Sequence, residues 1–98
     1  MVGDWLDQHT SRAPTALRDR VRRYVTAAGG STLPSSLSAA AQAALTRVLS
    51  HSGDRSVALD LLAADALITL ALLAQAQTVP EDLEQFAISV LRAWPSDA

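Results

Sequence analysis

The sequence predicts an all-α fold, a small four-helix bundle with a short N-terminal arm or helix, arranged around one central apolar helix. Three observations indicate this. Alanine and leucine dominate a chain that is 49% hydrophobic, and both residues favour helix. Residues 57–77 form an apolar run without Gly or Pro, which has the length of a helix rather than a strand. The other apolar residues recur at helical spacing, with no strand alternation or internal repeat.

Residues 1–12 are expected to form an arm or a short helix that docks on the core. Asp4 can cap a helix that begins at Trp5, but Trp5 and Leu6 supply the only large apolar area of this segment. Because a buried Trp removes a large apolar area from water, Trp5 is expected to lie against the core.

The first long helix is predicted over residues 14–28. Proline suits the first helical turn, where its missing N–H has no intrahelical partner, and the pair Gly29-Gly30 suits the helix end because glycine accepts the left-handed conformation. One face of this helix is apolar at one-sided amphipathic spacing: Leu17, Val21, Tyr24, Val25 and Ala28.

The second helix is predicted over residues 36–51, capped by a serine hydroxyl, because Pro34 disfavours helical geometry at Leu33. Gly53 suits the end of this helix, and Asp54 suits the N-cap of the next. Since the connection is short, the two helices are expected to be antiparallel neighbours. The second helix has this apolar face: Leu37, Ala41, Ala44, Leu45, Val48 and Leu49.

The central helix is predicted over residues 55–77. Its large apolar residues fall on two opposite arcs, Val57, Leu61, Ile68 and Leu72 on one, and Leu59, Leu62, Leu70 and Leu73 on the other. A helix that is apolar on most sides is typically buried among partners, so both arcs are expected to be covered. Between them runs a seam of small or polar residues that lets a neighbouring backbone approach closely: Asp60, Ala63, Ala64, Ala71 and Ala74, with Leu67.

The last helix is predicted over residues 80–94, antiparallel to the central one. Pro80 suits its first turn, and the acids that follow favour the positive end of the helix dipole. Its apolar face is Leu83, Phe86, Ala87, Val90, Leu91 and Trp94.

Composition and charge set the broad class. Ninety-eight residues without Cys make one domain with no disulfide. All eight basic residues are Arg, which is typical of a GC-rich genome, as in many bacteria. The N-terminus lacks the basic and apolar regions of a signal peptide, so a cytoplasmic location is expected. A membrane span is not expected, because Asp65 at the midplane would cost ~2.5–3.5 kcal/mol.

Asp60 and Asp65 are the most suggestive polar residues, because both lie on a helix that is expected to be buried. They are about 140° apart around the helix, so a shared proton or metal is disfavoured. His51, at the end of the second helix, joins them as a candidate ligand residue. A metal pair of His51 with Asp54 is disfavoured, since Gly53 interrupts the helical face. Each acid is expected to pair with an arginine or to cap a backbone group, or one of the two is expected to reach solvent. The candidate arginine partners are Arg18, Arg22, Arg47 and Arg92.

A local basic cluster comprises Arg18, Arg20, Arg22 and Arg23. These side chains spread around much of the first long helix, and Asp19 can pair with Arg22 or Arg23. With a net charge of −2, a solvated face is favoured over nucleic-acid binding, which is retained as the weaker alternative.

The sequence thus favours a helical interaction module that forms a homodimer or binds a protein partner. No nucleophile–base pair is visible, so enzymatic activity is disfavoured, and no cofactor or metal is expected. The alternative is a small-ligand-binding or catalytic bundle that uses Asp60 or Asp65 in an apolar pocket.

Overall fold

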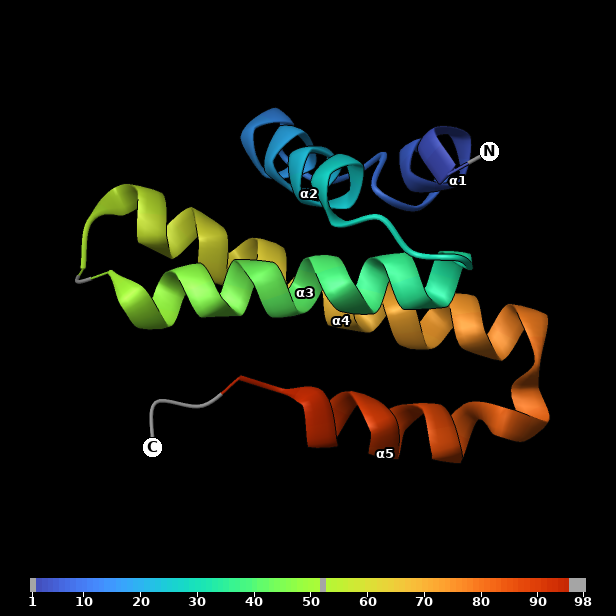
Figure 1. Ribbon diagram of the computed structural model, residues 1–98. Helices are drawn as coiled ribbons and strands as arrows, with labels where there is room; N and C mark the ends of the chain where they lie inside the picture. Colours follow the sequence, from blue (N-terminus) through green and yellow to red (C-terminus); the bar gives the residue numbers. More distant parts are fainter. Residues whose placement is uncertain (1, 52, 96–98) are drawn as a thin grey trace.

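The computed structural model describes residues 2–51 and 53–95. These residues form five α-helices and one 3₁₀ turn joined by short connections, and they contain no strand. The predicted all-α class is therefore confirmed. Figure 1 shows the order along the chain: α1 (Val2–His9), α2 (Thr15–Ala28), α3 (Leu33–Ser50), α4 (Arg55–Thr78), the 3₁₀ turn η1 (Pro80–Asp82) and α5 (Leu83–Ala93).

The antiparallel pair α3–α4 is the centre of the molecule. The two helices lie side by side along most of their length, α1 and α2 cross them on one side, and α5 runs along the opposite side (Figure 1). The predicted antiparallel relations of α4 to α3 and to α5 are therefore confirmed. The Asp54 carboxylate accepts the Val57 backbone N–H at 3.0 Å and caps α4 as expected.

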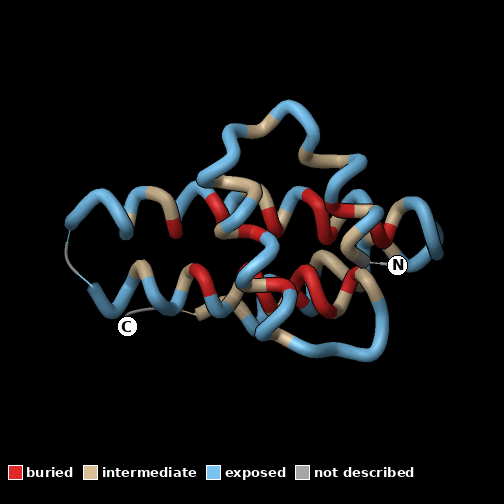
Figure 2. Tube along the Cα trace, turned by 90° about the horizontal axis from the view of Figure 1, so that it is seen from above, coloured by how far each residue is buried: buried red, intermediate tan, exposed pale blue. Residues whose placement is uncertain are grey.

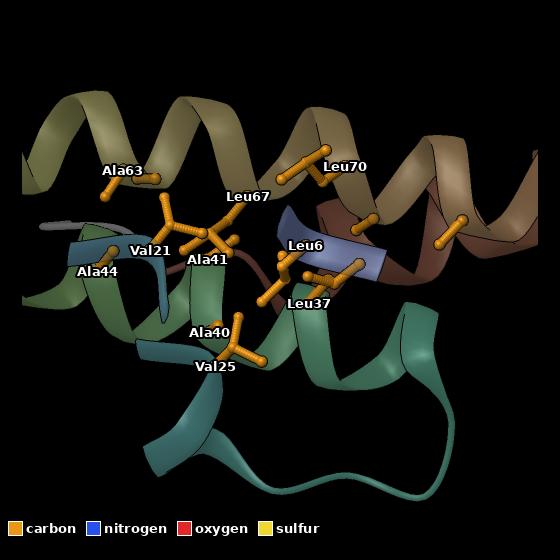
Figure 3. Packing of buried hydrophobic residues seen from close by; sticks show 13 residues of the cluster. Leu6, Val21, Val25, Leu37, Ala40, Ala41, Ala44, Ala63, Leu67 and Leu70 are labelled. Carbon is orange, nitrogen blue, oxygen red and sulfur yellow. The ribbon is translucent and has the colours of Figure 1, made fainter. Parts of the chain in front are cut away.

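The core between α3 and α4 is built mainly from small side chains. Each helix presents its alanines to the other, and Leu37 and Leu67 are the largest residues that are wholly buried among them (Figure 3). Because an alanine adds only a methyl group, the two backbones approach closely, as the small-residue seam predicts. The seam consists of Ala40, Ala41 and Ala44 on α3 and Ala63, Ala64, Ala71 and Ala74 on α4.

The expected burial of both leucine arcs of α4 is wrong. Leu70 is buried, but Leu61, Leu62 and Leu73 keep 52%, 55% and 38% of their surface exposed. The reason is geometrical, since α3 and α2 meet α4 on the small-residue seam and leave the flanks to α5. In Figure 2 the buried residues gather near the middle of the molecule, and the outer sides of the helices are largely exposed.

Helix α3 begins three residues earlier than predicted. Thr32 is its N-cap, and Thr32 and Ser35 form a reciprocal capping box in which each side chain accepts the other residue's backbone N–H. Pro34 lies in the first turn, where proline is tolerated. Before it, Gly30 has a φ of +123°, and a Cβ there would lie 2.6 Å from the Ser36 hydroxyl oxygen, so the turn requires glycine.

The predicted arm is a helix, α1, from residue 2 to residue 9. Leu6 is buried in the core, and the Trp5 indole N–H donates to the Gln77 side-chain oxygen at 3.1 Å while its ring stacks on His9. At the other end of the chain, the predicted helix 80–94 is divided into η1 and α5. Leu91, assigned to the apolar face of α5, is 73% exposed, whereas Val90 is buried.

Candidate functional site

Asp60 is the centre of the polar cluster that the fold brings together. It lies in the second turn of α4 on the small-residue seam, where α2 and α3 both pack, and its side chain has no exposed surface. A carboxylate at this depth is costly unless it is paired and hydrogen-bonded. The predicted burial of Asp60 is therefore correct, and its partners determine its role.

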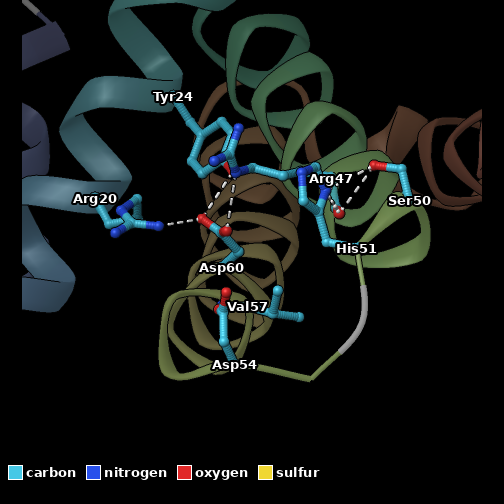
Figure 4. A network of polar contacts seen from close by, with 8 residues as sticks. All are labelled: Arg20, Tyr24, Arg47, Ser50, His51, Asp54, Val57 and Asp60. Carbon is cyan, nitrogen blue, oxygen red and sulfur yellow. Dashed lines mark hydrogen bonds and ion pairs between the residues drawn. The ribbon is translucent and has the colours of Figure 1, made fainter.

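Three donors from two other helices satisfy Asp60. Oδ1 accepts hydrogen bonds from the Arg20 guanidinium and, at 2.8 Å, from the Tyr24 hydroxyl, while Oδ2 accepts from Arg47 Nε at 3.2 Å. Arg20 and Tyr24 come from α2, and Arg47 comes from α3 (Figure 4). The cluster therefore ties α2, α3 and α4 together at one point.

The arginines keep Asp60 ionised. Burial raises the pKa of the Asp60 carboxyl, but the hydrogen bonds from Tyr24 and Arg20 and the charges of Arg20 and Arg47 outweigh it, so the pKa lies below its usual value. Burial raises the pKa of Tyr24, as do the hydrogen bond to Asp60 and the negative charge of Asp60. An ionised carboxylate with both oxygens occupied is poorly suited to proton transfer near neutral pH, so Asp60 is an anchor for its neighbours.

A cavity of about 330 Å³ opens beside this cluster. Three arginines and one aspartate line it, so its formal net charge is +2. The pocket beside Asp60 therefore has a positive formal charge. We call it the arginine cleft; its lining is Arg20, Arg23, Tyr24, Ala27, Arg47, Ser56 and Asp60.

Asp65 and His51 do not join Asp60. Asp65 is exposed on α4, so it is the one of the two acids that reaches solvent. His51 is exposed at the end of α3, where its Nδ1 lies 3.0 Å from the Arg47 carbonyl oxygen and 3.0 Å from the Ser50 hydroxyl (Figure 4). Neither residue lines the arginine cleft.

The basic cluster of α2 is divided between two sides of the helix. Arg18 and Arg22 pair with Asp7 of α1, whereas Arg20 and Arg23 line the arginine cleft. The pairing expected between Asp19 and the arginines that follow it is not found among the described residues. The four arginines are thus divided between the contact with α1 and the arginine cleft.

Sequence reasoning missed Arg20 and Tyr24 as partners of Asp60. Of the four candidate arginines, the structure assigns Arg47 alone to Asp60 within the described residues. Arg20 and Tyr24 are four residues apart and therefore share a face of α2, which was the available signal. Tyr24 was interpreted as a core residue, yet its ring lies at the core edge and its hydroxyl reaches the carboxylate.

The side of α4 that carries Leu62 and Leu73, opposite the small-residue seam, is a second candidate site, and we call it the outward side of α4. Among the described residues, α4 alone is long and apolar enough to cross a membrane, with a mean hydropathy of 2.1 over its most apolar 18 residues. The core helix of a soluble protein meets the same criterion, but only 39% of this stretch is buried. Large apolar side chains are therefore left at the surface, which usually marks an interaction site.

The described residues contain no group of three or more His, Asp or Glu side chains placed to hold a metal ion. The arginine cleft and the outward side of α4 are thus the two features that offer specific chemistry. No protein-family model, no curated protein and no solved structure matches this chain.

Proposed function

We propose that this protein is a helical interaction module that pairs with a second copy of itself through the outward side of α4. One observation carries the proposal: Leu62 and Leu73 stand more than a third exposed on the most apolar helix of the chain. Covering two such leucines removes apolar area from water at ~25 cal/mol per Å². A two-fold pair is the commonest way in which a soluble chain covers a patch of this kind.

The spacing of the outward residues favours an antiparallel pair. Leu62, Ala66, Thr69 and Leu73 follow one another at intervals of four, three and four residues, so they share one side of α4. We call this stripe the outward stripe. Its order, large, small, small, large, reads the same in both directions. A second α4 running the opposite way therefore places each leucine against a leucine and the small residues opposite each other.

The polar groups near the stripe are compatible with burial in such a pair. The Thr69 hydroxyl donates to the Asp65 backbone carbonyl at 3.0 Å, so it needs no partner from outside its own helix. The Asp65 side chain lies beside the stripe, about 40° around the helix from Thr69, at the rim where water still reaches it. A polar rim around an apolar centre is the usual anatomy of a protein interface.

Sedimentation equilibrium over a wide concentration range tests the proposal. We expect the wild-type chain to be a dimer and the double variant Leu62→Glu/Leu73→Glu to be a monomer, because four carboxylates would face one another in the pair. Leu91→Glu is the matched control, since Leu91 is 73% exposed on α5, away from the stripe. A wild-type monomer at all concentrations would contradict the proposal, as would a double variant that still dimerises.

Cysteine cross-linking tests the antiparallel direction, because the chain has no cysteine of its own. We expect Ala66→Cys and Thr69→Cys chains, when mixed, to form a disulfide between them. Leu62 and Leu73 are 11 residues apart, so in an antiparallel pair the two copies of Leu62 lie ~16 Å apart along the axis. A Leu62→Cys chain should then not cross-link to itself, since a disulfide needs Cα atoms within ~7 Å. Its efficient self-cross-linking would indicate a parallel pair and overturn the antiparallel arrangement.

A further inference from the structure

The arginine cleft holds more positive charge than its one carboxylate balances. Arg20, Arg23 and Arg47 converge on it from α2 and α3, and Asp60 is the only acid in its lining. A structural ion pair requires one arginine for one carboxylate. The surplus of two guanidinium groups around a cavity of about 330 Å³ therefore makes the cleft favourable for an anion.

Most of the donors in the cleft are available. A guanidinium group carries five N–H donors, and Arg20 and Arg47 each make one hydrogen bond to Asp60. Within residues 2–51 and 53–95, neither side chain donates elsewhere, and Arg23 makes no ion pair or side-chain hydrogen bond. The cleft thus offers many N–H groups that an oxyanion with several acceptor oxygens can use.

Asp60 holds two of these arginines in place before any ligand arrives. Its carboxylate is wholly buried and accepts from Arg20 with one oxygen and from Arg47 with the other, so the two guanidinium groups stand on either side of it (Figure 4). Fixing long side chains in advance lowers the entropy that is lost on binding. Asp60 is a positioning residue in this arrangement, and the donors that touch the ligand are the arginines.

The beginning of α4 adds to the positive character of the cleft. Ser56, in the first turn of this 24-residue helix, lines the cavity with a hydroxyl group. The helix dipole places partial positive charge at this end, and the capping carboxylate of Asp54 offsets part of it. The dipole alone does not make a site, but here it acts on the same cavity as the three arginines.

We propose that the arginine cleft binds the phosphate group of a small ligand, with Arg23 and Arg47 as principal donors and Arg20 at the base. Planar guanidinium groups match the oxygens of a phosphate in pairs, and a phosphate dianion balances the +2 charge of the cleft. The cavity is larger than an inorganic phosphate and lies at the lower end of the range for small-molecule sites, so it has room for the organic part of a small phosphate ester.

This site is independent of the proposed dimer. Asp60 faces the α2–α3 side of α4, whereas the outward stripe lies on the opposite side of the same helix. Phosphate binding and self-association are therefore measured separately, and the failure of one leaves the other standing.

Titration with inorganic phosphate, followed by NMR of the backbone amides and arginine Nε–H groups, tests the proposal. Each phosphate addition is compared with sodium chloride at the same ionic strength, so that general screening is subtracted. We expect saturable shifts centred on Arg20, Arg23, Arg47 and Ser56, and a higher melting temperature in phosphate than in chloride. Phosphate effects that equal those of chloride would overturn the proposal.

Arg23→Gln is the decisive variant. Arg23 is exposed and, among the described residues, forms no hydrogen bond with Asp60, so its replacement should leave the buried cluster and the fold intact. We expect the dissociation constant for phosphate to rise at least tenfold. Arg92→Gln makes the same charge change on exposed α5, outside the cleft, and should change the constant by less than twofold. Equal affinities of Arg23→Gln and the wild type would refute the assignment.

Discussion

Replacing Asp60 by Asn tests whether the buried carboxylate holds α2, α3 and α4 together. The substitution keeps the shape of the side chain and removes its charge, leaving Arg20, whose side chain is 18% exposed, beside a neutral amide. A hydrogen bond between charged groups contributes ~1.5–3 kcal/mol and a neutral one ~0.5–1.5 kcal/mol. Arg47 is about half exposed, so water and salt screen its contribution to below ~1 kcal/mol.

Together these contributions give an expected loss of ~2–5 kcal/mol in the free energy of unfolding, which overlaps the range found when one partner of a buried pair is removed. A chain of this length has ~5–15 kcal/mol in total. The melting temperature should therefore fall by on the order of 10–30 °C. Urea denaturation at pH 7, followed by circular dichroism, measures the loss.

Asp65→Asn is the matched control for this experiment, because it makes the same change on the same helix at an exposed position. It should alter the free energy of unfolding by less than ~0.5 kcal/mol. If Asp60→Asn costs less than ~1 kcal/mol, or if both variants lose the same amount, the reasoning about the buried cluster is refuted.

Two further predictions follow from the same structure. The pKa of Asp60 is lower in the folded state than in the unfolded state, so the ionised carboxylate stabilises the fold fully above its unfolded pKa of ~3.9, and this stabilisation should be lost as the pH falls through the lower folded value. The Asp60→Asn variant should lack this part of the loss of stability in acid. Identical profiles of stability against pH for the variant and the wild type would contradict the assignment. Leu70→Ala should lower the free energy of unfolding by ~2–5 kcal/mol because Leu70 is buried, whereas Leu61→Ala should lower it by less than ~1 kcal/mol. Urea denaturation at low protein concentration measures both losses. Equal losses would mean that the two leucine arcs of α4 are equally covered.

The sequence was sufficient to predict the helices because each carries a local signal. Amphipathic spacing and the flanking Pro and Gly residues located α2 and α5 to within a few residues, and Asp54 located the start of α4. The start of α3 was missed because its N-cap, Thr32, precedes Pro34, which was expected to prevent helical geometry at Leu33. Local signals identify an element, but which of its faces is buried depends on the partners that the chain brings to it.

The central helix illustrates this limit. When leucines lie on opposite faces of a helix, the hydrophobic pattern does not indicate which face is buried. The large residues of both arcs were therefore expected to be buried. In the structure, α3 packs on the alanines of α4, because small side chains let the two backbones come close together. Several leucines of α4 therefore remain at the surface. The partners of Asp60 were unpredictable for a similar reason, since eight arginines were available and the packing of α2 selects Arg20.

Both proposed sites follow from the way in which α4 uses its small residues. The alanine seam of α4 packs on α3, and Leu62 and Leu73, which lie outside this seam, stay more than a third exposed. The one acid within that seam, Asp60, lies where α2 crosses the pair, and neutralising a carboxylate at that depth draws in arginines from both neighbouring helices. Two guanidinium groups meet this one carboxylate, so the arginines bring more positive charge and more N–H donors than the carboxylate can balance. Burying one negative charge thus leaves a positively charged cleft beside it. The exposed leucines on one side of α4 and the arginine cleft on the other thus both result from the packing of the alanine seam on α3.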